Sequence, residues 1–194
     1  MKQFKVSVSN NALSRAESAL EEIPRAFRKA LPRAINRTLI SGRVIASKAA
    51  AEKFSVKASE VKKACRIVKA SGKKPEGELR LSGSNLPLRS FAHTPRSENT
   101  TGARRKQVSV SISRSRREVL NKGFKWRGHI FERTGIRKAT KANHRVHETI
   151  KKRYGPSVVA MVGNQAEKVQ DRMNEMLQTR LDHEVNAILE GKAK

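Results

Sequence analysis

Apolar residues at helical spacing predict a long amphipathic helix in the first third of the chain. They recur every four positions, at Ile23, Phe27, Leu31, Ile35 and Leu39. This spacing places them on one face of a helix of roughly 25–30 residues. Pro24 suits the first helical position, whereas Pro32 is expected to kink or split the helix.

A second long helix is predicted at the C-terminal end. The segment Gly155-Pro156-Ser157 has the composition of a turn followed by a helix start. No Gly or Pro interrupts the chain from Asn164 to Glu190. One face of the helix carries Val158, Val162, Val169, Met173, Met176, Leu177, Leu181, Val185 and Ile188.

Strand patterns occupy the N-terminus and the middle of the chain. Phe4, Val6 and Val8 alternate with polar residues, as do Val108, Val110 and Ile112. Further strands are predicted at 78–81, 86–91 and 129–133, and a mobile hairpin tip at 92–107. We therefore predict an α+β fold, with N-terminal helices and a long C-terminal helix packed on a central, mostly antiparallel sheet that carries a basic loop. The expected domain is 1–194, divided into 1–65 (strand and helices), 66–154 (basic sheet and loop) and 155–194 (helix).

The charge of the chain indicates, in addition to the fold, that the protein binds a polyanion. The chain has 43 Lys and Arg against 17 Asp and Glu, a net charge of +26 in 194 residues. Residues 1–22 are neutral and residues 155–194 carry −1, so the whole excess lies between Ile23 and Tyr154. Such a concentration of like charge is stabilised by a polyanion or a strongly acidic partner, and nucleic acid is the commonest polyanion in a cell.

Three basic clusters are the candidate contacts with nucleic acid or with an acidic partner. Two of them have a plain alternative: the helical row can be a solvated face, and the central loop can serve solubility alone. Clusters of this kind are expected to bind phosphate without recognising base sequence. They are the helical row Arg25, Lys29, Arg33 and Arg37, the loop run Arg104, Arg105 and Lys106, and the group Arg114, Arg116 and Arg117 beyond the strand at 108–113.

Aromatic residues lie among cations at 122–131. Phe124, Trp126 and Phe131 alternate with Lys and Arg, a pattern that suits stacking of single-stranded bases. The chain has only eight aromatic residues with which to build a core. Packing in the core or in a subunit interface is therefore the favoured interpretation.

Enzyme chemistry is not indicated. The nucleotide-binding and hydrolase motifs are missing, and carboxylates in the basic region are too few for a metal-dependent nuclease. His144, His147 and Glu148 have the wrong spacing for a zinc hydrolase and no third ligand. We predict no catalytic residues, no metal and no cofactor. A single cysteine, no signal peptide and no membrane-spanning apolar run favour synthesis in the cytoplasm.

The chain resembles the minor tail protein Z family of long-tailed bacteriophages, also called tail-completion proteins. The resemblance rests on the stretch Pro32–Thr38 (PRAINRT), on the Lys/Gly-rich turn at 71–77 that leads into Leu79–Leu88, and on Tyr154–Val158 (YGPSV). It extends over nearly the whole chain as a basic middle between amphipathic ends.

The resemblance implies a structural virion protein, assembled in the host cytoplasm, that acts in tail completion or head–tail joining at the top of the tail. Its expected partners are the tail terminator or tube protein, the head–tail connector proteins and double-stranded DNA bound without sequence specificity. It also implies a homo-oligomeric ring, with a hexamer as the common case. The alternative is a free, non-specific nucleic-acid-binding protein of the host or a prophage.

Overall fold

The computed structural model describes residues 2–6, 24–97, 107–139 and 146–190, together with helical positions 14, 16 and 18. The described residues form two compact units. Unit 1 lies within 1–50, 61–83 and 158–194, and unit 2 consists of 51–60 and the described part of 84–157. The predicted α+β class is confirmed, since helices and several antiparallel sheets are both present. The assignment of 1–194 to a single domain stays a prediction.

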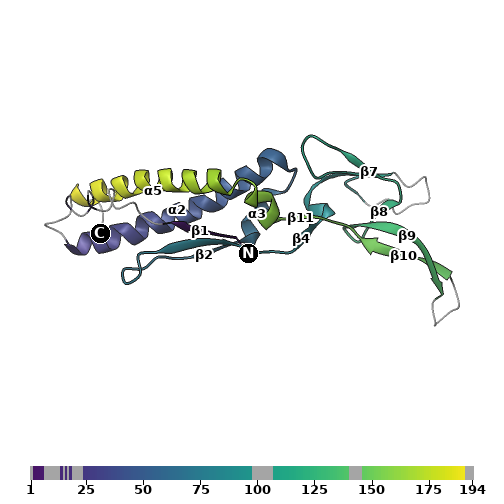
Figure 1. Ribbon diagram of the computed structural model, residues 1–194, viewed down its shortest axis with the longest axis horizontal. Helices are drawn as coiled ribbons and strands as arrows, with labels where there is room; N and C mark the ends of the chain where they lie inside the picture. Colours follow the sequence, from purple (N-terminus) through teal and green to yellow (C-terminus); the bar gives the residue numbers. More distant parts are fainter. Residues whose placement is uncertain are drawn as a thin grey trace. The chain divides into compact units, whose positions relative to one another are not determined.

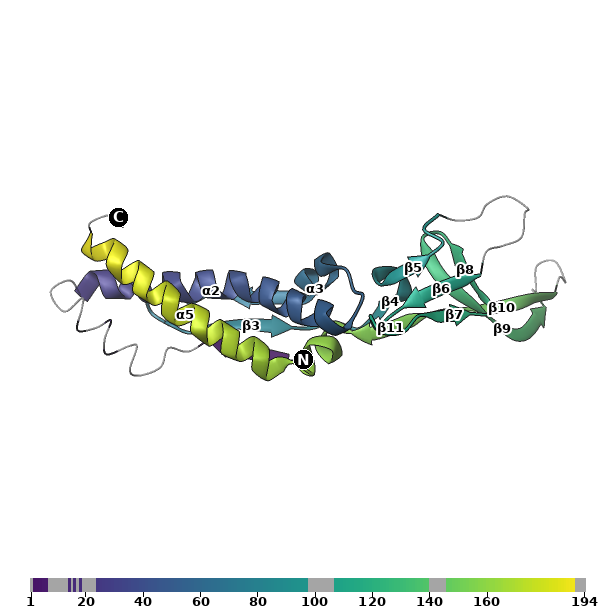
Figure 2. The ribbon, with the colours of Figure 1, turned by 90° about the horizontal axis from the view of Figure 1, so that it is seen from above.

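Unit 1 packs two long helices on a three-stranded antiparallel sheet (Figures 1 and 2). The sheet has the order β1-β3-β2, with β1 at Lys2–Val6, β2 at Cys65–Val68 and β3 at Gly77–Leu81. Helix α2 spans Pro24–Lys53 and is followed by the short helix α3 (Ala58–Ala64). Helix α5 spans Ala166–Leu189 and is preceded by the short helix α4 (Val158–Gly163). Helix α2 continues through Pro32, so the predicted split does not occur.

The helical faces predicted from apolar spacing are the faces that build the core of unit 1. On α2, Leu31, Ile35 and Leu39 are buried, whereas Arg28, Lys29 and Arg33 are exposed. The matching residues of α5 are Val169, Met173, Leu177, Leu181 and Val185, all buried. The C-terminal helix begins later than predicted: Tyr154–Ser157 is strand β11, and α4 ends before Asn164.

Most residues of the stretch Pro32–Thr38, one basis of the family resemblance, have structural roles. The Asn36 side-chain amide donates to the Ala70 carbonyl at 3.0 Å, and its oxygen accepts from the Ala70 N–H at 2.9 Å. Arg37 forms an ion pair with Glu184 of α5, whose side chain is buried. Ala34, Ile35 and Thr38 are fully buried. The motif therefore connects α2 to the end of β2 and to α5.

Unit 2 is built from short antiparallel strands. One sheet has the order β5-β6-β7, a second β10-β9-β8, and β11 pairs with β4. The strands are β4 (Asn85–Pro87), β5 (Ala92–Thr94), β6 (Val108–Ser111), β7 (Glu118–Leu120), β8 (Gly123–Trp126), β9 (His129–Ala139), β10 (Val146–Lys152) and β11 (Tyr154–Ser157), with a 3-10 turn, η1, at Leu88–Ser90. The predicted hairpin between strands 86–91 and 108–113, with 92–107 as its tip, is wrong in its first strand. Ala92–Thr94, inside the predicted tip, is strand β5 and pairs with β6 in the register Thr94↔Ser109, whereas β4 pairs with β11. Residues 98–106 lie outside the described chain.

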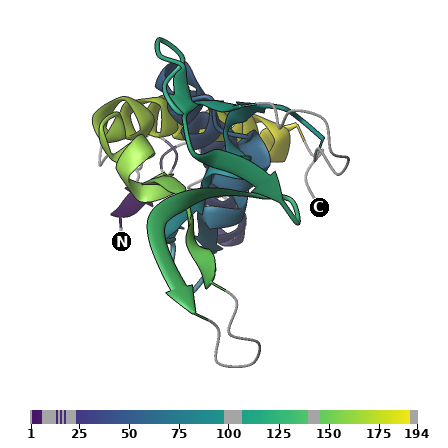
Figure 3. The ribbon, with the colours of Figure 1, turned by 90° about the vertical axis from the view of Figure 1, so that its right-hand side faces the viewer.

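A tight hairpin turn joins β8 to β9. Arg127 and Gly128 between them have φ values of 46° and 71°. Two successive positive φ values define the turn type that matches the twist of paired strands, and the first of these positions favours Asn, Asp or Gly. An arginine there is strained by about 1–3 kcal/mol. The hairpin β9–β10 that follows is long and strongly curved (Figure 3).

The single cysteine lies in the core of unit 1. Cys65 is buried, and its Sγ–H contacts the Val61 carbonyl oxygen at 3.2 Å. Burial raises the pKa of the Cys65 thiol to about 11, against the smaller opposing effect of Arg43. At pH 8 only about one such thiol in a thousand is ionised, and the thiolate is the reactive form.

We therefore expect Cys65 to react with a disulfide reagent at pH 8 at least about 100-fold more slowly in the folded protein than in denaturant. The measurement is the labelling rate followed by mass spectrometry. Equal rates in the two states would contradict the burial of this side chain.

Candidate nucleic-acid interface

A basic hollow of about 630 Å³ lies on unit 2, beside the sheet β5-β6-β7. None of the described residues that line it is Asp or Glu. The cations come from separate parts of the chain, since Arg96 follows β5, Arg117 precedes β7 and Lys125 lies in β8. The backbone bridge Val56↔Phe91 brings the segment before α3, which carries Lys57, next to the start of β5. The lining residues are Lys57, Phe91, Ala92, His93, Thr94, Arg96, Ser111, Arg117 and Lys125.

Arg117 is held in the hollow by two hydroxyl groups. Its Nε donates to Ser109 Oγ at 2.9 Å, and its Nη2 donates to Thr94 Oγ1. These hydroxyls contact each other at 2.7 Å, and their residues face one another in the β5–β6 register. Neutral oxygens fix the position of the guanidinium but do not neutralise it. Its remaining N–H groups are therefore a pre-positioned donor set for an anion.

Backbone oxygens orient two further polar groups of the hollow, Lys125 and His93. Lys125 Nζ donates to the carbonyl oxygen of Arg96. His93 Nδ1 lies 2.9 Å from the carbonyl oxygen of Phe91, and because a carbonyl only accepts, this nitrogen carries the hydrogen. Four cationic side chains, those of Lys57, Arg96, Arg117 and Lys125, thus surround one concave surface. That arrangement suits phosphate oxygens.

The structure separates the predicted contact residues into different roles. Arg117 lines the hollow, and Arg114 and Arg116 are exposed in the segment between β6 and β7. Lys29 and Arg33 are exposed on α2, and Arg25 lies in the same helix at a position whose side chain is not described. Arg104, Arg105 and Lys106 lie outside the described residues.

Arg37 is the predicted contact residue that also has a clear role in the fold. Its guanidinium pairs with Glu184, which is only 3% exposed. The buried carboxylate depends on this partner, because an isolated buried charge is strongly unfavourable. Sequence patterns did not identify Lys57, Arg96 and Lys125 as partners of Arg117, since only strand pairing brings them together.

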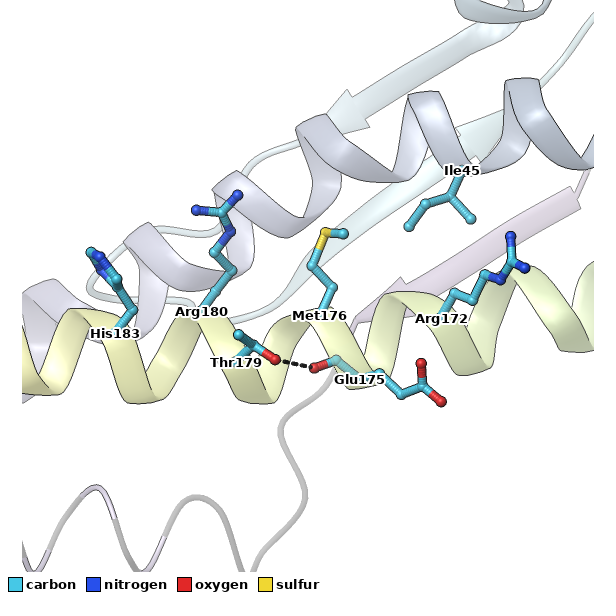
Figure 4. A pocket seen from close by; sticks show the side chains of 7 residues that line it. All are labelled: Ile45, Arg172, Glu175, Met176, Thr179, Arg180 and His183. Atoms are coloured by element: carbon cyan, nitrogen blue, oxygen red, sulfur yellow. Dashed lines mark hydrogen bonds between the residues drawn. The ribbon is translucent and has the colours of Figure 1, made fainter.

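A second hollow, of about 510 Å³, lies between α2 and α5 of unit 1 (Figure 4). Ile45 comes from α2, and the other lining residues come from α5: Arg172, Glu175, Met176, Thr179, Arg180 and His183. Acidic and basic side chains are mixed around an apolar floor of Ile45 and Met176. This hollow therefore lacks the uniform positive charge of the basic hollow.

His129 is the ionisable group with a lowered pKa. Desolvation is the largest cause, and the nearby Arg89 and Lys152 add to it, so all three effects favour the neutral imidazole. In the described part of the chain, no three His, Cys, Asp or Glu side chains gather in a way that would hold a metal ion. Glu148, from the predicted His-x-x-His-Glu stretch, instead bonds to Arg133 and to the Gly135 N–H.

A family model, prophage minor tail protein Z (GPZ), matches residues 11–191. The chain belongs to this family. Membership confirms the resemblance found in the sequence and makes the chain a structural protein of a phage tail. Neither the curated proteins nor the solved structures contain a match to it. Among the helices that the structure describes, none is both long enough and apolar enough to cross a membrane.

The described lining of the basic hollow carries four cations, and neutral oxygens position two of them, Arg117 and Lys125. The chemistry that it supports is reversible binding of an anion.

Proposed function

We propose that this minor tail protein Z acts in tail completion or head–tail joining at the head-proximal end of the tail, as a ring whose basic surface contacts DNA without sequence specificity. The observation that carries the proposal is the basic hollow of unit 2. Unit 2 as a segment has 21 Lys and Arg against 6 Asp and Glu, so it holds +15 of the net charge of +26. A ring around packaged DNA would use such a surface to offset the charge of the phosphates.

Binding in this proposal occurs through phosphates alone. Arg117, Lys57, Arg96 and Lys125 would hold phosphate oxygens in the hollow, and the exposed Arg114 and Arg116 would add contacts nearby. Phosphate contacts position a protein on DNA without reading its sequence, because sequence specificity needs contacts with base edges in the grooves. An alternative ligand for the same surface is an acidic rim of a connector or tail terminator protein. A binding experiment with DNA distinguishes the two ligands.

The first test is the salt dependence of binding to a random-sequence duplex. If about six cations of one subunit contact phosphates, the plot of log affinity against log salt concentration should have a slope of about −5. A fourfold variant in which Gln replaces Lys57, Arg96, Arg117 and Lys125 should lose about four phosphate contacts. Its slope should therefore be less steep by about 0.9 for each lost contact, and its binding at least about 100-fold weaker at moderate salt.

A charge-matched variant makes this test specific. Lys62, Lys69, Lys73 and Lys74 are exposed residues of unit 1, and replacing all four by Gln removes the same charge away from the hollow. This control is expected to retain most of the affinity. Equal losses in the two variants would mean that net charge alone, and not the hollow, governs binding.

The position in the particle needs a separate observation. Electron microscopy of the native particle should show the protein as a ring around the tail axis at the end next to the head. A protein that co-purifies with nucleic acid but never with particles would instead support the alternative, a free non-specific nucleic-acid-binding protein.

A further inference from the structure

One face of the sheet β10-β9-β8 carries a row of aromatic rings. Phe124 of β8 faces Phe131 of β9 in the register, and Trp126 faces His129. Directly paired residues of antiparallel strands project from the same face. The Phe131 ring centroid lies 5.9 Å from that of Phe124, in a stacked arrangement, and 5.8 Å from that of Trp126.

These rings are not part of the core. Trp126 is 45% exposed, and Phe124 and Phe131 are half-buried. On the next strand, the exposed Ile150 pairs with Arg133 and continues the same face. Packing in the core, one of the roles favoured from the sequence, therefore does not account for these rings, because other described residues leave much of their surface uncovered.

Cations lie directly against the rings. The guanidinium carbon of Arg127 is 4.7 Å from the Trp126 ring centroid, and that of Arg133 is 5.4 Å from the Phe124 centroid. Lys152 of β10 pairs with Phe131 in the register, and its Nζ lies 5.6 Å from the ring centroid of Tyr154. Arg133 shares its charge with Glu148, but Arg127 and Lys152 form no ion pair with a described carboxylate.

The conformation of Arg127 points to a role for its side chain. Its φ of 46° places it in the left-handed region, at a turn position where Asn, Asp or Gly is unstrained. Residues held in such strained conformations cluster at active sites and ligand-binding sites. Here the side chain places a guanidinium over the indole ring.

We propose that this aromatic–cationic face, made of Phe124, Trp126, Arg127, Phe131 and Lys152, binds single-stranded nucleic acid. Bases would stack on the three rings, and the flanking phosphates would contact Arg127 and Lys152. Stacking accepts any base, because every base has a π-face. Duplex DNA does not present its bases in this way, so the ligand is a single strand or a duplex end with unpaired bases.

The charge of the face favours this occupant over a protein. Arg127 and Lys152 lie beside the rings without an ion-pair partner among the described carboxylates, and unit 2 carries a net charge of +15, so charge complementarity favours a polyanion. The site is also separate from the basic hollow. Lys125, which lines the hollow, lies between Phe124 and Trp126 in β8, and alternate residues of a strand project from opposite faces.

The experiment uses the fluorescence of Trp126, the only tryptophan of the chain. The full-length protein is titrated with a short oligothymidylate, with an abasic phosphodiester strand of the same length, and with a duplex of the same charge. We expect the oligothymidylate to quench the emission and to bind at least about 10-fold more tightly than the abasic strand, because only the former can stack. Equal affinity and equal quenching by the two strands would overturn the proposal.

Variants locate the binding on this face. Phe124→Leu and Phe131→Leu are each expected to weaken oligothymidylate binding about 10-fold while leaving the abasic strand almost unaffected. Ile136→Ala is the matched control, because Ile136 is an exposed residue of β9 outside the aromatic–cationic face. Unchanged affinity for oligothymidylate in both Phe variants would overturn the proposal, even if other residues of the protein bind DNA.

Arg127→Asn separates a binding role from a structural one. Asparagine relieves the backbone strain, so the melting temperature should stay the same or rise, while the affinity for oligothymidylate should fall about 5-fold. A lower melting temperature with unchanged affinity would assign Arg127 to the fold and contradict the proposal. Concentration-dependent self-association that is abolished by Phe124→Leu, with no response to oligothymidylate, would assign the face to a second copy of the chain.

These outcomes are independent of the proposed contact with duplex DNA. If both proposals hold, the variant with four Gln replacements in the basic hollow loses duplex binding but still responds to oligothymidylate. A protein that binds duplex but shows no base-dependent quenching would retain the proposed function and lose only this inference.

Discussion

Replacing Arg37 by methionine is expected to lower the free energy of unfolding by about 2–4 kcal/mol. The substitution keeps the length of the side chain and removes the charge that faces Glu184. Because Glu184 is 3% exposed, its carboxylate would be left in the core of unit 1 without its ion-pair partner. The Arg37 side chain is about half exposed, so the loss should fall below that of a fully buried pair. Denaturant unfolding followed by circular dichroism measures the change.

Two further variants test the cause. Lys29→Met removes an exposed cation from the same helix and should change the free energy of unfolding by less than about 0.5 kcal/mol. Arg37→Met combined with Glu184→Met should recover most of the lost stability, because apolar side chains often replace a buried ion pair at little cost. A double variant as unstable as Arg37→Met alone would show that the unpaired carboxylate is not the reason.

Replacing Gly155 by alanine is expected to destabilise unit 2 by about 1–3 kcal/mol, the range for overpacking a core. Gly155 is buried in β11, and an added Cβ would lie 2.6 Å from Cε2 and 2.9 Å from Cζ of Phe91. Phe91 is 1% exposed, and its backbone is bridged to Val56, so the ring has little room to move. The measurement is the midpoint of thermal or denaturant unfolding.

Gly72→Ala is the matched control for this prediction. A Cβ at Gly72 would meet its nearest neighbour, the Arg28 carbonyl oxygen, at 3.6 Å, an ordinary van der Waals distance. Its effect should stay within about 0.5 kcal/mol. Phe91→Leu in the Gly155→Ala protein should give a smaller loss than the sum of the single changes, because the two side chains occupy the same space. Strict additivity would argue against the close approach of Gly155 and Phe91.

The contacts behind these two predictions involve residues from two of the motifs on which the family resemblance rests. In Pro32–Thr38, Asn36 bonds to Ala70 and Arg37 pairs with Glu184. In Tyr154–Val158, Gly155 allows the ring of Phe91 to approach the backbone of β11. The sequence indicated a turn and helix start at Gly155–Ser157, but the structure places these residues in a strand paired with β4. Short strands that contain proline and glycine lack the alternation by which strands are recognised.

The long elements were predictable because their periodicity reflects burial directly. The four-residue spacing through Leu31, Ile35 and Leu39 predicted the buried face of α2, and the row from Val169 to Val185 predicted that of α5. The alternation of Val108 and Val110 with serines predicted β6 in the same way. Each of these patterns is local, so a single stretch of sequence contains all the information that is needed.

The sequence by itself determined the α+β class, the apolar faces of the two long helices, the concentration of positive charge in the middle of the chain and the family. Only the tertiary structure decided which cations meet. It joined Lys57, Arg96, Arg117 and Lys125 around one hollow, paired Arg37 with a buried carboxylate, and left the rings of Phe124 and Trp126 against cations and outside the core. The physical reason is that strand register and bridges such as Val56↔Phe91 depend on contacts between residues far apart in the chain, which no local pattern of polarity records.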